Sequence, residues 1–284
     1  RRAMHGVLSW TKRLRVVYRP LGVVGVISPW NGPFVLAINP TLQALVAGNA
    51  VIPCGTTGET PTLSADEVRR VIAITVEVAA GRVPVIAGAG GNATAKTVAL
   101  AQECAGLGVD GLLVVTPYYN RPGQAGLEAH FRAVADAVDL PVILYDVPGR
   151  TGTALSPATT LRLAQIPNVR GIKEASGNVI TAQVLTAALA RNPAPGGFDV
   201  LCGDDVLFLP MAAIGAVGVV SVTANLMPEA VAEVVRLARD GRYAEARERH
   251  LRLAPVHAAM FLEPNPVPIK AAMHDAELCT AEVR

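Results

Sequence analysis

The sequence predicts an α/β protein, and within that class a (β/α)8 TIM barrel with a short, truncated C-terminal helical extension. Short apolar runs alternate with amphipathic stretches at regular intervals along the chain. Runs that are apolar on both faces and separated by single helices indicate a parallel sheet. Eight such units favour a closed barrel over an open doubly wound sheet. The expected strands are Val23–Ile27, Ala50–Cys54, Pro84–Ala87, Gly111–Val115, Pro141–Tyr145, Val169–Ile172, Asp199–Cys202 and Val217–Val220.

Helix start signals support the amphipathic stretches between these runs. Ser64 lies three residues before Glu67, the spacing of a capping box, and Ser156 is followed by Pro157. We expect a basic N-terminal arm over 1–21, the barrel over 22–222 and a helical region over 223–284. The expected helices are Pro40–Val46, Ala65–Ala80, Ala93–Gly106, Gly126–Val138, Pro157–Gln165, Ile180–Arg191, Val206–Ile214, Pro228–Asp240 and Arg242–Met260.

Composition narrows the function classes. Hydrophobic residues make up 51% and charged residues 17%, which indicates a large core and argues against disorder. The net charge of +2 gives no reason to expect nucleic acid or an anionic membrane as a partner. The longest apolar stretch, Leu207–Val222, contains Pro210 and is shorter than the roughly 20 residues that span a bilayer.

The cysteines predict neither a disulfide framework nor a metal site. They are widely spaced and form no CxxC pair and no Cys/His pair. This usage is typical of reduced thiols in a cytoplasmic protein. The four are Cys54, Cys104, Cys202 and Cys279.

Lys173 stands at the end of an expected strand, where it runs into a loop. In a dry pocket the pKa of its amine would fall, and the amine could form a Schiff base with a carbonyl. Most lysines at strand ends are instead solvated. Polar clusters also follow three other strands, and strand ends of a βα barrel meet at one mouth. These clusters are GTTGE at 55–59, TPYYN at 116–120 and YDVPGRT at 145–151.

Together the four strand ends indicate an imine-forming site with a proton relay and a carboxylate clamp. The small-residue turn at 55–59 offers two hydroxyls and free backbone N–H groups to a carboxylate. Each cluster has an alternative on its own. The turn could be only a tight turn, Tyr118 and Tyr119 could be rim or interface aromatics, and Arg150 could be solvated.

Seven motifs resemble the dihydrodipicolinate synthase family, whose superfamily of lysine-dependent pyruvate aldolases also includes N-acetylneuraminate lyase. They span about residues 55–273: GTTGE, TPYYN, YDVPGRT, GIKEASGN, LCGDD, GVVSVTAN and EPNPVPIK. The resemblance implies a lyase of lysine and diaminopimelate biosynthesis that condenses pyruvate with L-aspartate 4-semialdehyde to 4-hydroxy-tetrahydrodipicolinate. It implies no metal and no cofactor, because the lysine imine is the electron sink.

The same resemblance implies a role for each site residue. Lys173 forms the Schiff base with pyruvate, and Tyr145 transfers protons beside it. Thr56 links Tyr145 to Tyr119, which family members donate across a dimer interface. Thr57 and a neighbouring backbone amide hold the pyruvate carboxylate.

Further residues implied by the resemblance bind the second substrate and line the pocket. Arg150 grips the carboxylate of the aldehyde, a bidentate task that suits a guanidinium group. Gly203 and Val220 line the pocket near the imine. A homodimer or homotetramer is implied. A sugar-acid lyase or 2-keto-3-deoxy sugar acid aldolase, and a catalytically dead chimera, remain as alternatives.

Residues 15–52 resemble the aldehyde dehydrogenase superfamily instead, through RVVYRPLGVVGVISPWNGPF and AGNAV. Asn31 would be an oxyanion-hole residue there, but the nucleophilic cysteine, general base and nucleotide fold of a dehydrogenase are missing. Because right-handed parallel crossovers share one topology, we expect the segment to supply the first βαβ unit of the barrel, with a strand over 22–29. A poorly packed N-terminus is the alternative.

Two further departures from the family concern assembly and regulation. The C-terminal helical region is expected to be short, which puts the common tetramer in doubt. The lysine feedback site carries Lys96 where a carboxylate often stands, and this ammonium would repel that of the ligand, so we expect weak or absent inhibition by lysine. Its positions are Thr60, Pro61, Ala65, Val68, Asn92, Lys96 and Tyr118.

Overall fold

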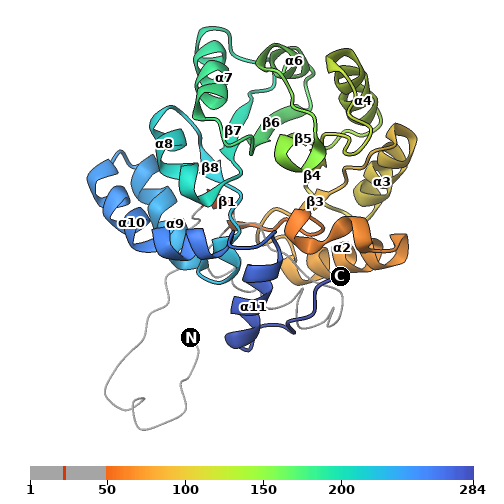
Figure 1. The fold of residues 1–284 in the computed structure, drawn as a ribbon. Helices are drawn as coiled ribbons and strands as arrows, with labels where there is room; N and C mark the ends of the chain where they lie inside the picture. The colour runs from red at the N-terminus through yellow and green to blue at the C-terminus, as the bar shows by residue number, and fades with distance from the viewer. Residues whose placement is uncertain (1–21, 24–48) are drawn as a thin grey trace.

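The structure is a computed structural model that describes residues 22–23 and 49–284. A ring of parallel strands lies at its centre and helices surround it (Figure 1). Strands β3 to β8 form one sheet in chain order, each paired in parallel with the next. Their bounds are Ile86–Gly88 (β3), Gly111–Val115 (β4), Val142–Asp146 (β5), Val169–Glu174 (β6), Asp199–Cys202 (β7) and Gly218–Val219 (β8).

Two short strands, β1 (Gly22–Val23) and β2 (Asn49–Ala50), lie between β8 and β3 and complete the ring. They pair with each other in parallel. A parallel bridge joins Val51 to Val85, and β1 lies against β8. The predicted α/β barrel is therefore confirmed.

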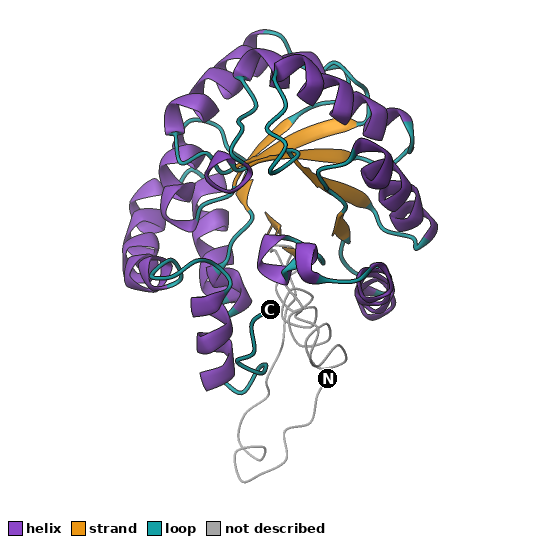
Figure 2. Cartoon of the chain, turned by 45° about the vertical axis from the view of Figure 1, so that its right-hand side comes forward, coloured by secondary structure: helices purple, strands orange, loops and turns teal. Residues whose placement is uncertain are grey.

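Helices cover the outer face of the sheet, as the view of Figure 2 also shows. Large apolar side chains such as Leu127 and Phe131 of α4 and Leu185 of α7 are fully buried against the strands. The helix bounds are Ala65–Ala79 (α2), Thr94–Gly106 (α3), Gln124–Asp136 (α4), Pro148–Thr151 (α5), Pro157–Leu163 (α6), Val179–Arg191 (α7), Phe208–Ala213 (α8), Pro228–Arg239 (α9), Tyr243–Ala259 (α10) and Val267–Asp275 (α11).

The predicted helix starts at Ser64 and Ser156 are confirmed. Ser64 Oγ accepts a hydrogen bond from the backbone N–H of Glu67, and the Glu67 carboxylate accepts one from the backbone N–H of Ser64 at 2.6 Å. Ser156 Oγ accepts from the backbone N–H of Thr159 at 3.2 Å. Both caps satisfy donors that a helix leaves unpaired in its first turn.

The helix α11 was missed from the sequence, because prolines at 264, 266 and 268 conceal it. Proline is tolerated in the first turn of a helix, where no intrahelical bond is lost. The expected helix Val206–Ile214 is divided into a 3₁₀ turn, η4 (Asp205–Leu207), and α8. The expected helix Pro40–Val46 and most of the expected strand at 22–29 lie outside the described residues.

The C-terminal helices lie beside the barrel opening at β1 and β2 (Figure 1). α9 packs against α10 and contacts β1, so it takes part in closing the ring. The proposed division of the chain at 222 stays a prediction. No helix in the described part of the chain is long and apolar enough to cross a membrane.

Gly88 marks the closest approach between β3 and the chain that follows β2. Its backbone N–H donates to the carbonyl oxygen of Pro53 at 2.9 Å. A Cβ atom at position 88 would lie 1.9 Å from the carbonyl oxygen of Cys54. The strand pairing at this joint therefore requires a residue without a side chain.

We expect Gly88→Ala to lower the free energy of unfolding by about 3 kcal/mol, because the backbone at Cys54 must move to make room. Gly106→Ala is the matched control, since a Cβ at the end of α3 meets no atom within 4 Å. The control should change stability by at most about 1 kcal/mol, in the stabilising direction. Denaturant unfolding of both variants measures the difference, and equal effects would contradict the analysis.

Candidate active site

One layer of side chains crosses four neighbouring strands at the C-terminal end of the sheet. Tyr145 pairs in register with Val115 on one side and with Lys173 on the other, and Lys173 pairs with Leu201. Residues in register on parallel strands point to the same face. Tyr145 and Leu201 belong to a buried cluster with Val220 inside the ring, so the layer faces the barrel interior.

Within this layer, Lys173 and Tyr145 are in direct contact. Lys173 is 8% exposed, and its Nζ lies 4.0 Å from the centroid of the Tyr145 ring. None of the ion pairs between described residues involves Lys173. Thr56 Oγ1 lies 3.1 Å from the Tyr145 hydroxyl oxygen. The amine, the phenol and the threonine hydroxyl are thus arranged as a nucleophile with a proton path beside it.

Gly203 leaves space beside the Lys173 side chain. Its backbone N–H donates to the carbonyl oxygen of Glu174 at 2.7 Å, which fixes the loop after β7 against β6. A Cβ atom at position 203 would lie 2.6 Å from Cβ of Ala175 and 3.1 Å from Cε of Lys173. A side chain there would press on the lysine stem, so glycine keeps the approach to the amine open.

The turn that follows β2 contains Thr57, which is buried. Its Oγ1 accepts a hydrogen bond from Nδ2 of Asn265 at 2.6 Å. Arg150, on the single-turn helix α5, donates from Nη2 to the main-chain oxygen of the same Asn265 at 3.1 Å. Thr57 and Arg150 are therefore connected through one residue of the C-terminal region.

A cavity of about 820 Å³ lies beside this layer and extends between α2 and α3. Five of the expected site residues are not among those that line it: Lys173, Thr57, Tyr119, Gly203 and Val220. Thr56, Tyr145 and Arg150 line it, together with Asn265. Six of the seven positions of the expected lysine site also line it, whereas Asn92 does not. These six are Thr60, Pro61, Ala65, Val68, Lys96 and Tyr118.

Tyr119 is not brought together with the other expected relay residues. It is 87% exposed, and no hydrogen bond within the described chain connects it to Thr56 or Tyr145. Its backbone has a φ of +68°, a conformation that costs a non-glycine residue free energy. A relay through Tyr119 of a second subunit stays a prediction.

Two buried carboxyl groups lie one residue beyond the reactive pair. Asp146 and Glu174 pair in register, on the face of the sheet opposite Tyr145 and Lys173. Asp146 Oδ1 accepts from the backbone N–H of Leu155 at 3.1 Å. Burial raises the pKa of Asp146 to about 7, and burial also raises the pKa of Glu174. Sequence reasoning did not assign them, although each directly follows an assigned site residue.

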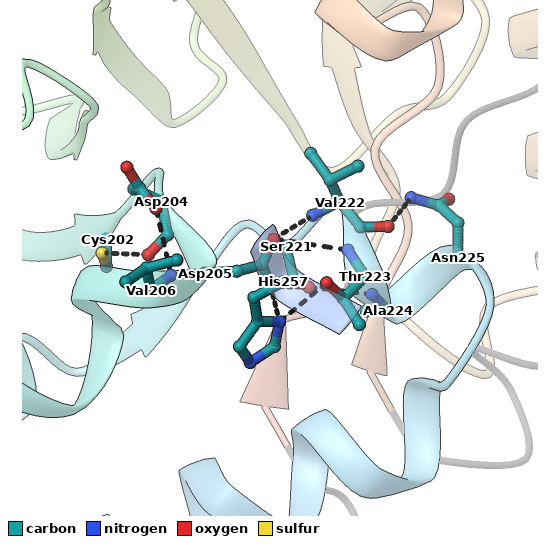
Figure 3. Close-up of polar contacts among 10 residues, drawn as sticks. All are labelled: Cys202, Asp204, Asp205, Val206, Ser221, Val222, Thr223, Ala224, Asn225 and His257. Atoms are coloured by element: carbon teal, nitrogen blue, oxygen red, sulfur yellow. Dashed lines mark hydrogen bonds and ion pairs between the residues drawn. The ribbon is translucent and has the colours of Figure 1, made fainter. Parts of the chain in front are cut away.

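A second buried network joins the loops after β7 and β8 to α10 (Figure 3). Asp205 accepts hydrogen bonds from the Ser221 hydroxyl and from the backbone N–H of Val222. Thr223 Oγ1 lies 2.8 Å from Nδ1 of His257. Burial lowers the pKa of His257. This network holds the loop that follows Val220 against the loop after β7 and against α10.

The four cysteines are free, and Cys279 is only half buried. Burial raises the pKa of the Cys54, Cys104 and Cys202 thiols to about 12, so these three are poor nucleophiles at neutral pH. The described residues contain no cluster of three or more metal-ligating side chains.

The family model for the dihydrodipicolinate synthetase family matches residues 39–284. The chain belongs to this family. The curated 4-hydroxy-tetrahydrodipicolinate synthase of Geotalea daltonii is 46% identical over 266 residues, which cover 92% of this chain and 90% of that protein. The dihydrodipicolinate synthase of Aquifex aeolicus superposes with a TM-score of 0.87 at 41% identity, over 93% of this chain and 90% of that one. The enzyme of Acinetobacter baumannii in complex with pyruvate has a TM-score of 0.86 at 39% identity, with the same coverage.

These comparisons extend the resemblance and correct its N-terminal limit. The family match includes 39–52, and an alignment over 92% of the chain contains much of 15–52. The comparisons thus give no support to an aldehyde dehydrogenase segment. A βαβ start is common to both families, so a short stretch of similar residues does not distinguish them.

The elevated pKa of Asp146 predicts a pH-dependent stability. The folded protein holds this proton more tightly than the unfolded chain, so its contribution to stability is present below pH 4 and is lost as pH rises to about 7. Asp146→Asn keeps a neutral group and an acceptor for Leu155. Relative to wild type, the variant should gain up to about 4 kcal/mol between pH 4 and pH 8.

Thermal unfolding across this pH range, with Asp139→Asn as an exposed control, measures the effect. A constant difference between Asp146→Asn and wild type would contradict the prediction, because it would show that folding does not raise the pKa of Asp146.

Proposed function

We propose that the protein condenses pyruvate with L-aspartate 4-semialdehyde to 4-hydroxy-tetrahydrodipicolinate through a Schiff base on Lys173. The observation that carries the proposal is the buried Lys173 amine over the Tyr145 ring, with Thr56 on the phenol. Membership of the dihydrodipicolinate synthetase family supports the same reaction, as does the pyruvate complex of the similar Acinetobacter baumannii enzyme. The cytoplasmic location and the place in lysine and diaminopimelate biosynthesis follow from this assignment as expectations.

The reaction begins at Nζ of Lys173, which attacks C2 of pyruvate. Loss of water gives the imine, and Tyr145 moves the protons that this step requires, with Thr56 as its hydrogen-bonded neighbour. Loss of a C3 proton converts the imine to an enamine, which attacks the aldehyde. The amine of the second substrate then closes the ring and displaces Lys173.

Thr57 and Arg150, the two proposed carboxylate-binding residues, both form a hydrogen bond with Asn265. Thr57, with its neighbouring backbone N–H groups, would bind the carboxylate of pyruvate. Arg150 would bind the carboxylate of the aldehyde, for which a planar guanidinium offers two parallel donors. Gly203 and Val220 would shape the space between them.

A sugar-acid lyase of the same superfamily would use the same lysine and tyrosine. Two observations favour the synthase: the arrangement of Thr56 and Arg150, and the identity to a curated synthase over 90% of its length. A folded but inactive protein is the remaining alternative, and covalent trapping decides it.

Borohydride reduction in the presence of pyruvate should leave a pyruvyl adduct on Lys173, because reduction makes the imine permanent. Peptide mass spectrometry locates the adduct. Lys173→Ala is the negative control, in which no adduct should form. Folded protein without an adduct would reject the Schiff-base mechanism and favour the inactive alternative.

Tyr119 is proposed to complete the relay of a second subunit in a homodimer or homotetramer. Its exposed ring and strained backbone support an interface role. Tyr119→Phe should lower kcat by about a hundredfold, the lower end of the range for a proton-transfer group, while pyruvate still forms the adduct. Steady-state kinetics and light scattering together test this. Full activity in a protein shown to be monomeric would exclude the role.

Inhibition by lysine is proposed to be weak, because Lys96 places an ammonium group in the wall of the cavity between α2 and α3. Two like charges at short range repel. Inhibition below millimolar lysine would contradict the proposal. Lys96→Glu should strengthen inhibition, which initial-rate measurements over a lysine series would detect.

A further inference from the structure

Asn265 lies in the segment between α10 and α11 and contacts both side chains that are proposed to bind substrate carboxylates. It is 7% exposed. Nδ2 donates to Thr57, 208 residues earlier in the chain, and its main-chain oxygen accepts from Arg150, 115 residues earlier. One residue thus sets the distance between the two carboxylate-binding groups.

The direction of the bond between Asn265 and Thr57 matters for the chemistry. An amide NH₂ group only donates hydrogen bonds, whereas a hydroxyl can both donate and accept. Because Thr57 Oγ1 accepts from Nδ2, its own hydrogen stays available for another acceptor. A carboxylate of pyruvate is such an acceptor. If position 265 offered only an acceptor, the Thr57 hydrogen would turn toward it and away from the substrate.

A buried ion pair fixes the same segment to the same turn. Nζ of Lys270, in α11, lies 2.5 Å from Oε2 of Glu59, two residues after Thr57, and both side chains are buried. This pair joins chain positions 211 residues apart. Removal of one partner of a buried ion pair leaves an uncompensated charge, so the two segments stay together in the folded protein. The pair limits movement of Asn265 relative to Thr57.

We propose that Asn265 is a positioning residue that turns the Thr57 hydroxyl hydrogen toward the carboxylate of pyruvate and holds Arg150 by its main-chain oxygen. The C-terminal segment between α10 and α11 is then part of the pyruvate site. The inference rests on the proposed function, since it takes Thr57 as the pyruvate-binding residue.

The test compares two substitutions of Asn265 that differ in shape and in hydrogen bonding. Asn265→Asp keeps the shape but presents only acceptors, so the Thr57 hydrogen turns away and a negative charge faces the substrate. Asn265→Ala removes the partner and leaves the hydroxyl free to rotate. We expect KM for pyruvate to rise at least tenfold in the aspartate variant and less in the alanine variant, with a smaller change in kcat.

A double-mutant cycle with Thr57→Val shows whether Asn265 acts on pyruvate binding through the Thr57 hydroxyl or through packing of its own side chain. If Asn265 acts through the Thr57 hydroxyl, Asn265→Ala should have no further effect on KM for pyruvate once that hydroxyl is gone. Asn168→Ala is the matched control, because its Nδ2 donates to the carbonyl oxygens of Ala135 and Val138, away from the site. It should lower the melting temperature and leave KM unchanged.

The inference is overturned by a KM in Asn265→Asp closer to wild type than in Asn265→Ala, and also by additive effects of Asn265→Ala and Thr57→Val. If Asn265→Asp does not fold, the double-mutant cycle of Asn265→Ala and Thr57→Val tests the inference by itself. The wild-type protein is trapped with borohydride and pyruvate in the same series. An adduct on Lys173 with unchanged KM in the variants rejects only the role of Asn265, whereas no wild-type adduct rejects the proposed function itself.

Discussion

The parallel hydrogen-bond ladder from β4 to β7 is the constraint on which the site depends. It holds Val115, Tyr145, Lys173 and Leu201 in one register, so the amine and the phenol meet because neighbouring strands are paired. Side chains alternate across a strand, and a slip of β6 by one residue would place Glu174 where Lys173 now stands. Because helices bury the outer face of the sheet, such a slip is strongly disfavoured. The helix packing therefore keeps Lys173 and Tyr145 on the inner face.

The alternation also places basic and acidic groups on opposite faces of the same two strands. Inside the ring are a lysine and a tyrosine, and directly behind them are two carboxyl groups with elevated pKa values. Buried polar networks fix loops beyond the strand ends, and Figure 3 shows the one around Asp205. The reactive groups Lys173 and Tyr145 thus stand on strands, whereas hydrogen bonds hold the loops that surround them.

Sequence reasoning succeeded where a residue type and a periodic pattern coincide. The strands Gly111–Val115 and Asp199–Cys202 were predicted with their observed bounds, and Lys173, Tyr145 and Thr56 lie together as expected. Asn265 and Lys270 lie in the EPNPVPIK motif, but no role was predicted for them, because their partners lie more than 200 residues earlier in the chain. The relay through Tyr119 stays a prediction, because it requires a second chain and Tyr119 is exposed in the single chain.

The contact between Asn265 and Thr57 has a consequence for how the protein is made. Thr57 is synthesised early, and its partner Asn265 comes 208 residues later. The ribosome therefore releases most of the barrel before Asn265 can bind the turn that follows β2. N-terminal segments of a chain begin to fold while the rest is still being made. A nascent chain that already contains Lys173 and Tyr145 therefore lacks the hydrogen bond between Asn265 and Thr57, which forms only when the segment before α11 emerges and docks.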